Sequence, residues 1–172
     1  MQRAASLIDM LPCPPIAVVL VSNPKRCVLK RGYVRAVAED PFVAQFGELL
    51  GSYRESGGLA CADNVLALLE GEVEQGLSML ARWIALRQVI SFEWQGQTWL
   101  PLFQFDRRDM SIHPELAPIV AELCGVYDAW ELAHWFARPN TTLDGLTPAE
   151  AFEDDAASVL QAARTDRFVI EG

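Results

Sequence analysis

The chain has 172 residues, of which 51% are hydrophobic and 22% are charged, and its formal net charge is −9. These values are ordinary for one globular domain or two small ones, and they disfavour an intrinsically disordered chain. No apolar run reaches the roughly 20 residues of a membrane-spanning helix, and the N-terminus lacks the continuous apolar core of a secretory signal, so we expect a cytoplasmic protein without a membrane role.

Charge is distributed unevenly along the chain. Residues 1–57 carry seven Lys or Arg against five Asp or Glu, whereas residues 58–172 carry seven against eighteen. A surface this negative repels the phosphates of nucleic acids, so any contact with DNA must be local. A protein partner therefore fits the composition better than a nucleic acid.

Residues 1–57 show fewer recognisable structural patterns than the rest of the sequence, and we assign them no role. A buried strand is indicated at Ile16–Val21, and a helix is expected around Pro41–Leu50, ended by Gly51. Between them, five basic side chains fall within the eleven positions 25–35. Such a stretch more often forms a solvated face than a binding site.

Residues 58–105 show two helices followed by a β-hairpin. A short helix is predicted over residues 63–69, and the second carries an apolar face at the i, i+3, i+4, i+7 spacing, made of Leu77, Leu80, Ala81 and Ile84. Residues 92–95 and 98–100 then flank Gly96 as two strands around a tight turn. Together these elements resemble a winged helix-turn-helix of the excisionase kind.

In that interpretation Arg82 and Arg87 are the candidate DNA-binding residues, because the second helix carries both on its other faces. The same segment also holds Glu70, Glu72 and Glu74. A helix that reads a DNA groove normally gathers several hydrogen-bond donors. A plain structural subdomain therefore stays open as the alternative.

Three further helices are predicted after Phe105. The first starts near Pro114 and has Gly125 available as its C-terminal cap, with an apolar stripe of Leu116, Ile119, Val120 and Leu123. Asp128 caps the second, whose aromatic side chains should fill the core and which must end before Pro139. A capping box at residues 147–150 starts the third. The apolar tail after it, residues 168–170, either docks on its own domain or reaches a partner.

The stretch from Trp135 to Pro148 resembles the W-[LF]-x-x-P-N-x-x-L-x-G-x-T-P signature of the Xre/MbcA/ParS toxin-binding domains. The matching residues are Trp135, Phe136, Pro139, Asn140, Leu143, Gly145, Thr147 and Pro148. Residues 159–164 are similar to the family's closing helix, and residues 99–106 to a segment that often precedes the domain, so the resemblance covers about residues 58–172. It departs from the pattern at Asp144, where Gly is commoner, and at Leu146, where a basic residue is common.

The resemblance implies that the C-terminal domain binds a RES-type toxin, an enzyme that consumes NAD, and neutralises it by covering its active-site cleft. In such family members the C-terminal end of the chain enters the toxin pocket. This implies partner-binding roles for Arg164, Arg167, Phe168 and the carboxylate of Gly172. It also implies a homodimer. The motif residues themselves, such as Pro139 and Gly145, are expected to build the fold.

Catalytic and metal-binding patterns are not evident. The two histidines, His113 and His134, have no ligand spacing, and the four cysteines form no C-x-x-C pair, so we expect reduced thiols and no metal. A nucleophile elbow, a P-loop and a dinucleotide-binding glycine motif are all missing. We expect neither an enzyme nor a cofactor.

The predicted fold is mainly α with a small β-hairpin. It comprises an unassigned segment (1–57), a winged helix-turn-helix-like module (58–105) and a helical toxin-binding-like domain (106–172). The expected function is that of an antitoxin with a RES-like toxin as partner. Two alternatives remain, a transcriptional regulator that binds operator DNA through residues 58–105, and an interaction module whose partner is not a toxin.

Overall fold

The computed structural model describes residues 41–69 and 73–172, so the strand expected at residues 16–21 and the basic stretch at 25–35 lie outside the described residues. The chain divides into two compact units, residues 1–48 and 49–172. The helices are α2 (Pro41–Ser52), α3 (Ala62–Leu68), α4 (Val73–Ala85), α5 (Leu116–Leu123), α6 (Ala129–Ala137) and α7 (Pro148–Glu171), with short 3-10 turns η3 (Leu102–Gln104) and η4 (Thr141–Leu143). The strands are β1 (Leu59–Cys61), β2 (Phe92–Trp94) and β3 (Gln97–Pro101). The predicted fold class, mainly helical with a little β-structure, is confirmed.

The sheet has three antiparallel strands in the order β1-β3-β2. Trp99 of the central strand lies opposite Cys61 on one side and Phe92 on the other. Gln95 and Gly96 form the turn between β2 and β3, and both have positive φ, 49° and 74°. Two left-handed residues in a two-residue turn follow the twist of the strands, which confirms the predicted hairpin. The short strand β1 was not predicted, because three residues are too few to show an alternating pattern.

The core around the sheet contains Val65, Leu80, Val89, Leu100 and Phe105, none more than 4% exposed. The predicted apolar face of α4 is partly wrong. Leu80 is buried and Ile84 packs against the core, but Leu77 is 55% exposed and Ala81 is exposed as well. Trp83 packs against the core instead. The helix is rotated from the expected orientation so that positions 80, 83 and 84 face the sheet and α3.

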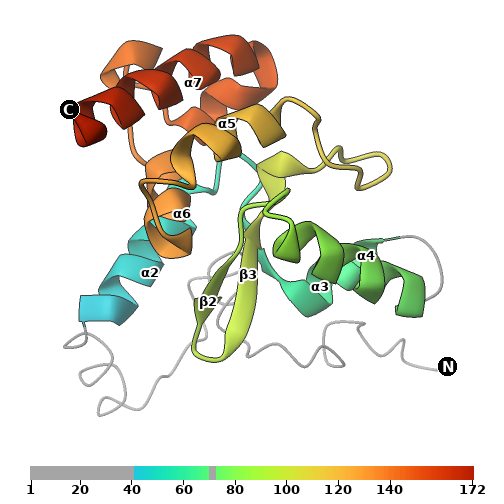
Figure 1. The fold of residues 1–172 in the computed structure, drawn as a ribbon. Coiled ribbons are helices and arrows are strands. Elements are labelled where there is room, and N and C mark those ends of the chain that lie inside the picture. Colours follow the sequence, from blue (N-terminus) through green and yellow to red (C-terminus); the bar gives the residue numbers. More distant parts are fainter. Residues whose placement is uncertain (1–40, 70–72) are drawn as a thin grey trace, which may run out of the picture. The chain divides into compact units, whose positions relative to one another are not determined.

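Helices α5, α6 and α7 pack together, and hairpin β2–β3 lies between α6 on one side and α3 with α4 on the other (Figure 1). The four residues of the predicted stripe in α5 are all buried. This helix begins at Leu116, two residues after Pro114, and Cys124 caps it in a right-handed conformation, so Gly125 does not serve as the expected cap. No helix of the described residues is both long enough and apolar enough to span a bilayer.

Both predicted capping signals in this part of the chain are confirmed. Asp128 and Glu131 form a capping box at the start of α6, and Thr147 and Glu150 form one at the start of α7. Helix α7 is interrupted at Asp155, whose φ of −148° and ψ of 71° are not helical. The Asp155 carboxylate accepts hydrogen bonds from the backbone N–H and the hydroxyl of Ser158, so it caps the second half of α7.

Two buried polar side chains connect segments that are distant in sequence. The side chain of Gln104, fully buried, accepts a hydrogen bond from the Ile90 N–H and donates to the carbonyls of Ile90 and Pro101. The hydroxyl of Tyr53, also fully buried, donates to the Ala133 carbonyl at 2.6 Å. Cys61 is disulfide-bonded, against the expectation of reduced thiols, and Cys124 is a free thiol.

Candidate protein-binding surface

The last turn of α7 presents three exposed apolar side chains. Phe168 is 77% exposed, Val169 is 72% exposed and Ile170 is 48% exposed. Successive residues of an α-helix point about 100° apart, so no single neighbouring element could cover all three. We call these three residues the C-terminal tip. Of the two outcomes expected for this segment, docking on its own domain is not what the structure shows.

Two residues before the tip, Asp166 joins α7 to α6 and to the loop that follows α6. Its Oδ2 accepts hydrogen bonds from Trp135 Nε1 at 2.7 Å and from Asn140 Nδ2 at 3.1 Å. Asn140 also organises its own loop, since its Oδ1 accepts from the N–H and the hydroxyl of Thr142, and its N–H donates to the Leu146 carbonyl. The Trp and Asn of the motif therefore act structurally, as expected, and they help to fix the direction in which α7 ends.

A second contact joins α7 to α5 through Glu122. Arg164 Nε lies 3.1 Å from Glu122 Oε1, and Arg167 Nη1 lies 2.5 Å from Glu122 Oε2. Arg167 Nε is also 3.6 Å from the carboxylate of Glu171, one turn further along. We call Glu122, Arg164 and Arg167 the Glu122 cluster. Because both arginine side chains are about half exposed, the ion pairs contribute little stability but hold the guanidinium groups in defined positions.

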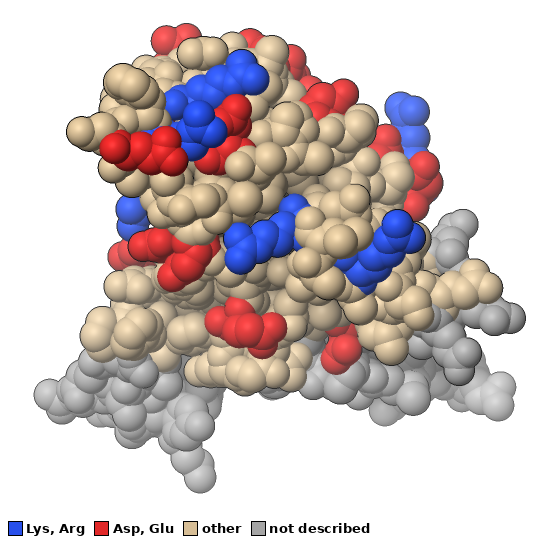
Figure 2. All heavy atoms as spheres, in the orientation of Figure 1, with Lys and Arg blue, Asp and Glu red and all other residues tan. Residues whose placement is uncertain are grey.

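The candidate residues at this end of the chain are therefore brought together. Arg164 and Arg167 lie beside the tip that contains Phe168. The Gly172 N–H donates to the Phe168 carbonyl at 3.1 Å, so Gly172 follows directly after the tip. On the face drawn in Figure 2, basic groups near the end of α7 lie beside acidic groups and form no patch of a single sign. A partner could bind this surface mainly through apolar contacts, with additional contacts to individual charged groups.

The two candidate DNA-binding residues have different surroundings. Arg82 is exposed in the last turn of α4, and its side chain makes no hydrogen bond or ion pair with the described residues. Arg87 lies after the end of α4, so its predicted place on that helix is wrong. It has a positive φ of 52°, and its Nη1 donates to the Cys124 carbonyl at 3.2 Å, where α5 ends. A positive charge is stabilising at a helix C-terminus, so Arg87 has a structural contact of its own. The exposed side of α4 also carries Leu77 and Met79, which are poor donors for phosphates or base edges.

Both histidines pack against aromatic rings. The ring centroids of His113 and Phe152 are 5.7 Å apart, and those of His134 and Trp130 are 4.9 Å apart. Within residues 41–69 and 73–172, no group of three or more His, Cys, Asp or Glu side chains could hold a metal ion.

Glu122 and Asp166 are the site residues that the sequence analysis missed. Glu122 is 42 positions from Arg164, and Asp166 is 31 positions from Trp135. No local pattern marks an acidic side chain as the partner of a residue that far away. Only the packing of α7 against α5 and α6 brings these pairs into contact.

Comparisons of this chain with protein-family models, with curated proteins and with solved structures found no match. The function of this chain is therefore inferred from the surface itself and from the motif in the sequence.

Proposed function

We propose that this chain is a protein-binding module that engages its partner through the C-terminal tip and the arginines beside it. The observation that carries the proposal is the exposure of Phe168 and Val169, 77% and 72%, on a helix held by Asp166 and the Glu122 cluster. Aromatic and arginine side chains supply much of the binding energy at protein interfaces. A helix end already fixed before binding also loses less conformational entropy when the complex forms.

The signature-like stretch from Trp135 to Pro148 supports a narrower proposal, in which the partner is a RES-type toxin and this chain is its antitoxin. The tip and the carboxylate of Gly172 would enter the cleft that binds NAD. A carboxylate there can pair with the basic groups that otherwise hold the NAD phosphates. In this proposal the chain works in the cytoplasm as an inhibitor rather than an enzyme, and a homodimer is the form that binds.

A capture experiment from the native host tests this function. Tagged full-length protein is compared with the double variant F168S/V169S, and with L146S as the matched control, because Leu146 is also an exposed apolar residue, 50% exposed, outside the tip. We expect a RES-like toxin to be retained by the wild type and by L146S and to be lost from the double variant. Retention by all three variants, or recovery of no toxin by any, would contradict the proposal.

A second candidate function is supported by the connectivity of residues 59–101. A strand, two helices and a hairpin follow one another, and the first strand joins the sheet beside β3. We propose that these residues form a winged helix-turn-helix-like module, with α4 in the position of the helix that reads DNA. Binding of DNA would depend on a small number of basic side chains, above all that of Arg82.

The test of DNA binding is fluorescence anisotropy with duplex DNA from upstream of the chain's own gene, measured at low and at physiological salt. Specific binding that weakens with salt, and that weakens further in R82Q, is the expected result. Equal affinity for an unrelated duplex, or no effect of R82Q, would leave residues 59–101 as a structural subdomain.

A further inference from the structure

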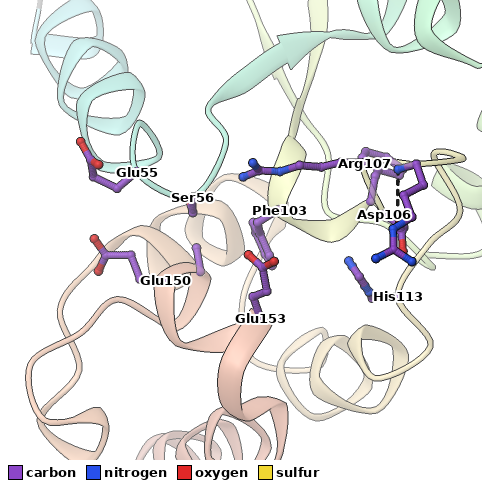
Figure 3. A pocket seen from close by; sticks show the side chains of 11 residues that line it. Glu55, Ser56, Phe103, Asp106, Arg107, His113, Glu150 and Glu153 are labelled. Atoms are coloured by element: carbon purple, nitrogen blue, oxygen red, sulfur yellow. Dashed lines mark hydrogen bonds between the residues drawn. The ribbon is translucent and has the colours of Figure 1, made fainter.

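A cavity of about 330 Å³ lies beside the first half of α7, away from the residues used by the proposed function. Its walls come from the segment before β1, from η3 and the loop after it, and from α7. The lining residues used here are Glu55, Phe103, Arg107, Arg108, His113 and Glu153. In Figure 3, Glu55 lies on one side, Arg107 and His113 lie on the opposite side, and Phe103 and Glu153 lie between them.

The loop that carries the two arginines has a fixed backbone. The carboxylate of Asp106 accepts a hydrogen bond from the Arg108 N–H at 2.8 Å, and that of Asp109 accepts from the Ser111 N–H at 2.9 Å. The ends of the loop are also joined, since the Asp106 N–H donates to the Ser111 carbonyl. Arg107 and Arg108 therefore start from defined positions at the edge of the cavity.

The floor of the cavity is aromatic and well packed. Phe103 contacts the rings of Tyr53, Phe136 and Phe152, with centroid separations of 6.1, 5.2 and 5.4 Å. His113 lies against Phe152 as well. Part of Phe103 remains accessible from the cavity. The floor can thus support an apolar group without rearranging.

Opposite charges line this cavity without pairing across it. Among the described residues, Arg107 and Arg108 form no ion pair, and neither do Glu55 and Glu153. The other two carboxylates of the lining are already engaged, since Glu150 belongs to a capping box and Asp106 accepts a hydrogen bond from the Arg108 N–H. The two guanidinium groups and the carboxylates of Glu55 and Glu153 therefore line a shared space without an ion pair to another described residue.

This arrangement selects the charge of a ligand. A phosphate or another multiple anion would be repelled by Glu55 and Glu153, and a polyamine by Arg107 and Arg108. A molecule that carries one positive and one negative charge can place each charge beside a group of opposite sign, so it avoids both repulsions. The volume is at the low end of the roughly 300–1,000 Å³ typical of ligand pockets, which fits a small molecule.

We propose that this cavity binds a free α-amino acid. The carboxylate of the ligand accepts hydrogen bonds from Arg107 and Arg108, in the two-pronged geometry that guanidinium groups favour. Its ammonium group donates to Glu153 or Glu55, and its side chain rests against Phe103. This site is independent of the C-terminal tip and of the partner that the tip binds.

Calorimetric titration of the full-length protein with each of the twenty standard L-amino acids tests the proposal. We expect at least one to bind, and its N-acetyl and its amide derivatives, which each remove one charge, to bind about tenfold more weakly or worse. The same loss is expected in R107Q/R108Q and in E153Q. The control R138Q, an exposed arginine outside the cavity, should bind like the wild type.

Three outcomes would overturn the proposal. The first is that none of the twenty amino acids binds. The second is binding that is unchanged in R107Q/R108Q and in E153Q, which would place the ligand elsewhere. The third is equal binding of the N-acetyl derivative, which would make the site one for simple carboxylates.

Discussion

Asp166 joins α7 to α6 and to the loop that follows α6, close to the C-terminal tip. One of its oxygens accepts hydrogen bonds from both Trp135 and Asn140, and Trp135 is only 8% exposed. Removal of the carboxylate leaves an indole N–H and an amide N–H without their acceptor, in a place where water replaces it poorly. The position of the tip should therefore depend on this residue more than on the exposed ion pairs beside it.

We predict that D166A lowers the free energy of unfolding by about 2 kcal/mol, the usual cost when hydrogen bonds to a charged group are lost. Urea denaturation followed by tryptophan fluorescence measures it. D154A is the matched control, because Asp154 is exposed and its side chain makes no hydrogen bond or ion pair with the described residues. A loss as large in D154A as in D166A would contradict the role given to Asp166.

Tyr53 provides a prediction about alkaline pH. Burial raises the pKa of its phenol well above 10.0, because the charged form would lose its hydration. A group whose pKa is higher in the folded state contributes stability that is complete below the unfolded pKa and is lost as pH rises through the folded pKa. The stability of the wild type should therefore fall above about pH 10.

In Y53F this alkaline loss should be smaller, while stability at neutral pH should drop by about 1 kcal/mol, since the hydrogen bond to Ala133 is gone. Thermal unfolding over a range of pH measures both effects. Tyr127, whose pKa is also raised by burial but to a lesser extent, supplies the comparison. If Y127F reduced the loss of stability at alkaline pH more than Y53F does, the assignment of this loss to Tyr53 would be wrong.

At the scale of elements, α7 is two helical segments joined at Asp155. The second segment begins where the Asp155 carboxylate accepts hydrogen bonds from Ser158, and hydrogen bonding from Ser158 also lowers the pKa of Asp155. This segment contains the residues that contact Glu122 and ends in the tip. Its start and its end are thus fixed by different side chains.

We expect D155A to increase hydrogen exchange at the amides of residues 157–159, because the first turn of a helix has no internal acceptors for its N–H groups. Exchange measured by mass spectrometry or NMR reports it. D155N keeps an acceptor oxygen and should restore most of the protection. Unchanged exchange in D155A would mean that packing of α7 alone defines the start of its second segment.

The Glu122 cluster gives a second prediction at this scale. E122Q should change the free energy of unfolding by less than about 1 kcal/mol, since half-exposed ion pairs are screened by solvent. Exchange at residues 168–171 should nevertheless become faster, because two contacts that hold the last turn are weakened. A large loss of stability without faster exchange there would show that Glu122 supports the core rather than the tip.

At the scale of the whole molecule, residues 49–172 form one compact unit, although the sequence analysis divides them at residue 105. The Gln104 side chain bonds to Ile90 and Pro101, and the ring of Phe103 packs against Phe136 and Phe152. The Phe103 contacts cross the proposed boundary. The parts before and after residue 105 therefore share one core.

In the full-length protein, residues 49–172 should accordingly unfold in a single cooperative transition. Coincident urea curves from circular dichroism and tryptophan fluorescence would establish this. Two separate transitions would instead favour independent folding of residues 58–105 and 106–172.

Much of the secondary structure was predictable because its signals are local. Capping boxes at residues 128–131 and 147–150, the turn at Gly96 and the apolar stripe of α5 each lie within a few positions, and all are present. The family resemblance also grouped Arg164, Arg167 and Phe168 as candidates, but only the structure places Phe168 within α7, which extends to Glu171. Strand β1 and the break at Asp155 were missed, since neither has a pattern long enough to read.

The sequence by itself thus determined where most helices start and stop, because a cap or a turn depends on residues that are adjacent along the chain. Only the tertiary structure decided which face of α4 is buried, that Glu122 pairs with Arg164 across 42 positions, and that Tyr53 bonds to Ala133 across 80. It also decided that residues 168–170 are exposed and that Arg107 and Glu153 line the same cavity. Contacts of this kind arise from the packing of whole elements, and a residue's type alone does not specify its distant neighbour.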